Sequence, residues 1–95
     1  MLGQIKLADF DWQGLQKMPQ RVASAASAIE NSGLTGASYR PLIYCGEQQV
    51  RGTNHWFIAE QTLITAVPER HVVKLAVNEF NGEFALVPNT IEQIF

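Results

Sequence analysis

The chain has 95 residues, of which 46% are hydrophobic and 17% charged, and its formal net charge at neutral pH is −2. This length and composition support one globular domain with a single core, which we place at residues 1–95. The small negative charge gives no basic field for nucleic acid, and no apolar run approaches the roughly 20 residues of a membrane span. With one cysteine and two histidines, the chain lacks both a disulfide pair and the close ligand spacing of a zinc site. We therefore expect no cofactor, no metal, no nucleic acid and no membrane partner.

The N-terminal third predicts an arm followed by one helix. Residues 1–6 show little periodicity, which is typical of a flexible arm or a short edge strand. From Asp11 onward, apolar residues recur at steps of three and four and form one stripe. Its members are Leu15, Met18, Val22, Ala25 or Ala26, and Ile29. Pro19 lacks a backbone donor, so we favour one kinked or two-part helix over residues 12–31, with a true start near Pro19 as the alternative.

After residue 37 the pattern changes to that of strands. Four strands are predicted, at residues 38–49, 53–65, 71–79 and 83–87. Gly46 is a predicted bulge, Asn81-Gly82 is a two-residue hairpin turn, and Pro88 ends regular pairing, after which the tail could add an edge segment. A helix stripe and an antiparallel sheet can each cover the other. The sequence thus predicts an α+β fold, with one N-terminal α-helix packed on a curved four- to five-stranded antiparallel β-sheet.

The connection between the first two predicted strands is Gln48-Gln49-Val50-Arg51-Gly52. A short, polar, glycine-containing link between two strand-like runs indicates a hairpin. Val50 is unusual there, because a purely structural turn prefers Asn-Gly or Asp-Gly. An apolar side chain at an exposed tip is typical of a contact with a partner.

Gln48, Val50 and Gly52 match Gln-x-Val-x-Gly, the motif of the first hairpin of the cystatins. The order of one helix and then four strands also resembles the cystatin fold, over nearly the whole chain. The lack of a disulfide and the short arm before Gly3 make the chain similar to the stefin group. This resemblance implies a reversible, tight-binding inhibitor of papain-like cysteine proteases that is not itself an enzyme.

In that family an N-terminal arm and two hairpin loops enter the protease cleft. The resemblance assigns Gly3 and Leu2 to the arm. The second loop departs from the family pattern, because this chain has Phe80-Asn81-Gly82-Glu83 where Pro-Trp or Leu-Pro is common. Phe80 is the candidate replacement for the apolar anchor, although packing within the hairpin is the simpler role. The predicted protease-binding residues are Leu2, Gly3, Gln48, Gln49, Val50, Arg51, Gly52, Phe80, Asn81 and Gly82.

Other interpretations stay open at this point. Apolar residues on both sides of the second strand, such as Trp56 and Ile58, are compatible with a non-inhibitory binding or assembly domain that uses an apolar sheet face. Strain at the Val50 hairpin would favour a domain-swapped homodimer. An enzyme would have to pair Cys45 with His55 or His71, and no third orienting group is evident.

The sequence also bears on the cellular compartment. The first six residues lack the apolar stretch of a signal peptide, and a single cysteine fits a reducing environment. We therefore expect a cytoplasmic protein. A mature secreted form without its signal peptide is the alternative.

Overall fold

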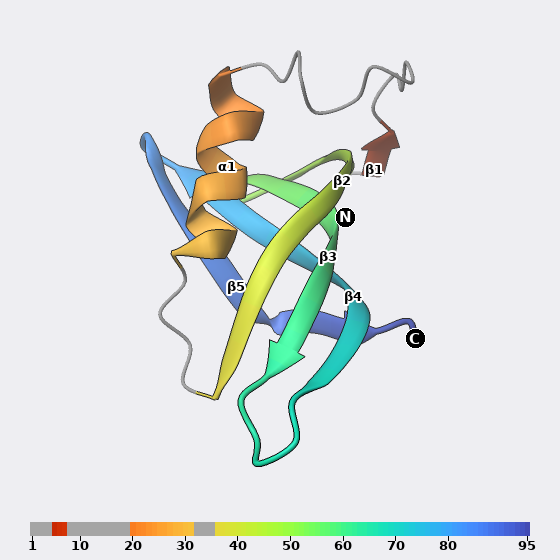
Figure 1. Cartoon of the computed structure of the whole chain (residues 1–95). Helices are drawn as coiled ribbons and strands as arrows, with labels where there is room; N and C mark the ends of the chain where they lie inside the picture. Colours follow the sequence, from red (N-terminus) through yellow and green to blue (C-terminus); the bar gives the residue numbers. More distant parts are fainter. Residues whose placement is uncertain (1–4, 8–19, 32–35) are drawn as a thin grey trace.

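The structure is a computed structural model that describes residues 5–7, 20–31 and 36–95. One helix, α1 (Gln20–Glu30), lies against a five-stranded antiparallel sheet whose strands follow the order of the chain. The strands are β1 (Ile5–Leu7), β2 (Ala37–Val50), β3 (Gly52–Leu63), β4 (Glu69–Phe80) and β5 (Glu83–Gln93). Figure 1 shows the long strands curving around the helix. The predicted α+β class, with a helix packed on an antiparallel sheet, is confirmed.

Helix α1 follows the predicted apolar stripe. It begins at Gln20, immediately after Pro19 in the sequence, and its buried residues are Val22, Ala25, Ala26 and Ile29. These positions recur at steps of three and four, so they share the face that contacts the sheet. At the other end, the Asn31 side chain donates to the Ser27 carbonyl at 3.0 Å and pairs one of the last backbone acceptors. Residues 12–19, which the prediction also made helical, lie outside the described residues.

The core lies between α1 and the concave face of the sheet. The inward residues of β3 and β4 alternate along each strand and are almost completely buried. They are His55, Phe57, Ala59, Val73, Leu75 and Val77. Each of the larger apolar side chains contributes about 1.5–3 kcal/mol by leaving water. Trp56 and Ile58 point to the opposite face and are half-buried.

Two irregularities bend β2. Its pairing with β3 shifts between Pro41 and Ile43 and again between Tyr44 and Gly46. An extra residue in one strand of an antiparallel pair increases the local twist and bends that strand. The second shift confirms the bulge predicted at Gly46. Together the two bulges give β2 the curvature that lets it wrap around α1 in Figure 1.

Strand β5 is longer than predicted. Its regular pairing with β4 stops at the Val87–Ala76 pair, just before Pro88, as expected. Pairing then resumes at Glu92–Lys74, so the strand continues to Gln93 and the prediction of an end near Val87 was wrong. Across the interruption, the Thr90 hydroxyl accepts the Ala76 N–H at 2.8 Å. A side-chain acceptor thus replaces a missing backbone partner, which no local pattern signals.

Candidate functional site

The tips of the two hairpins lie side by side. Because β3 pairs with both β2 and β4, its first residues lie beside the last residues of β4, and Thr53 is opposite Glu79. At Gly52 the approach is so close that an added Cβ would lie 2.3 Å from the Glu79 carbonyl oxygen and 3.2 Å from the Phe80 Cβ. We call residues 48–52 and 80–82 together the hairpin edge. The two predicted loops therefore form one continuous surface.

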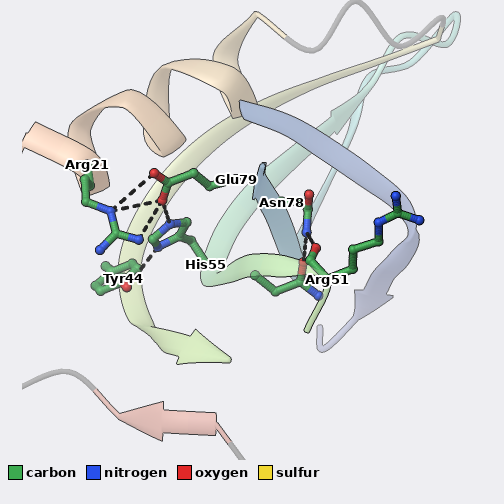
Figure 2. Close-up of polar contacts among 7 residues, drawn as sticks. Arg21, Tyr44, Arg51, His55, Asn78 and Glu79 are labelled. Carbon is green, nitrogen blue, oxygen red and sulfur yellow. Dashed lines mark hydrogen bonds and ion pairs between the residues drawn. The ribbon is translucent and has the colours of Figure 1, made fainter. Parts of the chain in front are cut away.

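A hydrogen bond fixes the first tip to the neighbouring strand. The Asn78 side-chain amide donates to the Arg51 carbonyl at 3.1 Å and to the Asn54 side chain at 3.0 Å, as Figure 2 shows for Asn78 and Arg51. Gly52 has a φ of 81°, in the left-handed region that side chains other than glycine rarely adopt. Gly52 is therefore required twice, for its backbone angle and for the close contact with β4.

The predicted residues of the first tip differ in exposure. Gln49 and Arg51 are exposed, whereas Val50 is half-buried and does not belong to the core. Gln48 accepts a hydrogen bond from the Trp56 indole at 3.1 Å, which ties its side chain to the outer face of the sheet. Val50 thus keeps part of its surface free for a partner, but less than a fully displayed tip residue would have.

The N-terminal arm is described only where it meets the sheet. Strand β1 pairs antiparallel with the end of β2, and Ile5 lies opposite Gln48. Ile5, the first residue of β1, therefore lies beside the first tip. The predicted arm residues Leu2 and Gly3 lie outside the described residues.

The second tip is the tight turn that Asn81-Gly82 predicts. Asn81 has a φ of 52° and Gly82 a φ of 79°, and the flanking residues Phe80 and Glu83 pair with each other. Two consecutive positive φ angles are those of a type I′ turn, whose twist matches antiparallel strands. Phe80 is 41% exposed, and the Arg51 guanidinium carbon lies 5.4 Å from its ring centroid. Phe80 is therefore neither buried in the hairpin nor fully exposed to solvent.

Beneath the hairpin edge lies a polar network that the sequence did not predict. His55, which is 1% exposed, contacts the Tyr44 hydroxyl at 3.1 Å through Nδ1 and the Glu79 carboxylate at 2.8 Å through Nε2. Arg21, in the first turn of α1, donates to the same carboxylate at 2.8 and 3.0 Å. Figure 2 shows these side chains converging from α1, β2, β3 and β4. The one available signal was His55 on the inward side of its strand, since a buried imidazole needs partners.

The protonation pattern of the network follows from its contacts. Hydrogen bonds from Arg21 and then from His55 lower the pKa of Glu79, so its carboxylate is ionised and can only accept. The Nε2 atom of His55 must then donate, and in the neutral imidazole Nδ1 accepts from Tyr44. Burial raises the pKa of Tyr44 to about 12, which keeps that hydroxyl a donor. The network therefore links the start of α1 to the end of β4 with every member paired.

Acid should weaken this link. The unfolded chain has an ordinary glutamate pKa, for which the reference value is 4.5, whereas the folded protein holds the pKa of Glu79 lower. The stabilisation from Glu79 is therefore complete above the unfolded value and is lost as the pH falls through the folded value. We expect the unfolding free energy of Glu79→Gln to fall less than that of the wild type between about pH 5 and pH 3. Parallel pH profiles in chemical denaturation would contradict this assignment.

Cys45 and the two histidines do not form a nucleophile–base pair. Both ring nitrogens of His55 contact Tyr44 and Glu79, and those of His71 contact the Phe95 carbonyl and Glu69. Burial raises the pKa of the Cys45 thiol, which disfavours the thiolate that such chemistry needs. Within residues 5–7, 20–31 and 36–95, no group of three or more Cys, His, Asp or Glu side chains is placed to hold a metal ion.

On the outer face of the sheet, half-buried Trp56 contacts other residues of the same chain. Trp56 donates to Gln48, and the Lys74 ammonium lies 6.0 Å from its ring centroid. Ile43 pairs with Ile58 and is exposed beside it. The apolar area of this face is therefore partly covered by polar side chains of the same molecule.

The chain has no match among known proteins. No protein-family model, curated protein or solved structure matches it. In the described part of the chain, α1 is too short and too polar to cross a membrane.

Proposed function

We propose that this chain is a reversible inhibitor of papain-like cysteine proteases with a cystatin-like fold, and that its hairpin edge enters the active-site cleft. The observation that supports this most is the direct contact between the two tips, in which Gly52 packs against the backbone of Glu79. A Gln-x-Val-x-Gly tip joined to a second hairpin is the arrangement that a two-loop wedge requires. Strand β1 adds a third segment beside Gln48.

The physical argument for inhibition concerns preorganisation. A protease cleft is complementary to a strained, extended substrate whose carbonyl lies next to the nucleophile. A wedge can fill the cleft on both sides of the nucleophile without presenting a peptide bond for attack. Because Asn78 fixes the first tip by a hydrogen bond and the two tips pack closely, they lose little conformational entropy when they dock. Tight binding then depends on how much apolar surface the wedge buries.

The apolar surface available limits the affinity. Fully burying a valine contributes about 1.5–3 kcal/mol, and half-buried Val50 can supply only part of that amount. Nanomolar binding needs about −12 kcal/mol. The first tip is therefore insufficient alone. The proposal requires Phe80 and the arm residues Leu2 and Gly3 to contribute as well.

The test is inhibition of papain by two matched variants. Val50→Asp places a charge where the proposal buries an apolar group, so we expect the inhibition constant to rise by roughly 100-fold or more. Val67→Asp adds the same charge in the loop between β3 and β4, where Val67 is 78% exposed, and should change inhibition little. If the wild-type chain inhibits papain and the two substitutions raise the inhibition constant equally, the first tip does not enter the cleft.

A further inference from the structure

Arg51 lies in the first hairpin, and its side chain reaches the second. Its backbone lies at the first tip, where Asn78 holds its carbonyl at 3.1 Å. Its guanidinium carbon lies 5.4 Å from the centroid of the Phe80 ring in the second hairpin. A cation over an aromatic face is attracted by the ring quadrupole, which restricts where the side chain points. This attraction favours positions of the Arg51 charge near the Phe80 ring before any partner binds.

Among the residues that the structure describes, no ion pair neutralises that charge. The ion pairs in residues 20–31 and 36–95 engage Arg21, Arg40, His55, His71 and Lys74, and none of them includes Arg51. Glu79, the carboxylate just before the second turn, is occupied by Arg21 and His55. A guanidinium beside an aromatic ring still carries five N–H donors in a planar fork. Arg51 can thus offer these donors to a carboxylate outside the chain.

We infer that Arg51, held over Phe80, determines which proteases the hairpin edge binds, by pairing with a carboxylate on the rim of the cleft. This inference rests on the proposed function and specifies the partner as a papain-like protease with an acidic rim. Because the guanidinium spans both tips, the contact also requires that the two hairpins dock together. Phe80 would then supply the apolar contact of the second tip, with the charge of Arg51 beside its ring.

The experiment compares wild type, Arg51→Gln and Arg51→Lys against two papain-like proteases, one with an acidic and one with a basic cleft rim. Arg70→Gln is the matched control. Arg70 is exposed near the start of β4, whereas Phe80 is the last residue of that strand, and the loss of either arginine changes the net charge equally. Arg51→Gln should weaken binding to the acidic-rim protease by roughly 10- to 100-fold, and by much less for the basic-rim protease. Arg51→Lys should restore only part of the affinity, since an ammonium lacks the planar fork.

The dependence of the affinity on ionic strength is a second test of the same contact. Wild-type affinity for the acidic-rim protease should fall between about 20 mM and about 500 mM salt, and Arg51→Gln should reduce that dependence while Arg70→Gln does not. The inference is overturned if Arg51→Gln weakens binding to both proteases equally, or if Arg70→Gln weakens binding to the acidic-rim protease as much as Arg51→Gln does. If the wild type inhibits neither protease, the proposed function fails, and the inference fails with it.

Discussion

Gly52→Ala is expected to lower both the stability of the protein and its inhibition of papain. The new methyl group would lie 2.3 Å from the Glu79 carbonyl oxygen, a backbone atom that can move only if β4 moves. The positive φ of 81° adds about 1–2 kcal/mol of backbone strain, and overpacking adds about 1–3 kcal/mol. We expect the free energy of unfolding to fall by about 2–5 kcal/mol in chemical denaturation.

Gly82→Ala separates the two causes. Gly82 has nearly the same φ, 79°, but an added Cβ there meets nothing within 4 Å. This variant should therefore lose only the conformational part, about 1–2 kcal/mol. The difference between the two variants measures how tightly the tips are packed against each other. If both glycines give the same loss, the close contact between the hairpins does not exist in solution.

Glu79→Leu is expected to destabilise the protein by about 1–3 kcal/mol, because it leaves the buried Nε2–H of His55 without an acceptor. The Glu79 side chain is only 18% exposed, so water cannot readily take its place once leucine fills the site. Arg21 also loses its partner, but it is mostly exposed, and that loss adds little. Chemical denaturation at neutral pH measures the change.

A second glutamate–histidine pair provides the control. Glu69 contacts His71 at 3.3 Å, and its side chain is 62% exposed. Glu69→Leu should therefore change the free energy of unfolding by less than about 0.5 kcal/mol. The same chemical change is thus made once in a buried network and once at the surface. Similar effects at the two sites would mean that the Tyr44–His55–Glu79–Arg21 network contributes no more than a surface contact.

Local periodicity was sufficient to predict most of the fold. The buried stripe of α1 and the alternation along β3 and β4 arise from the repeat of each element, so neighbouring residues reveal them. The turn at Asn81-Gly82 and the bulge at Gly46 follow from residues that tolerate unusual backbone angles. The sequence allowed an edge segment after Pro88 but did not show that it would continue β5, because this depends on the Thr90 hydroxyl meeting the Ala76 N–H from another strand.

The candidate site was predictable only in part. The motif located the first tip, and the turn residues located the second, but their contact is a property of the strand order and of the register between β3 and β4. The network around His55 joins four elements that are far apart in the sequence, so no spacing reveals it. The half-burial of Val50 also depends on this tertiary packing.

Inhibition by the hairpin edge is tested most directly by titrating active-site-calibrated papain with the intact chain at increasing substrate concentration. We expect complete inhibition at a one-to-one ratio, relieved competitively as substrate increases, because wedge and substrate would occupy the same cleft. Full papain activity in the presence of about 10 μM of the chain, far above the range of tight complexes, would contradict it.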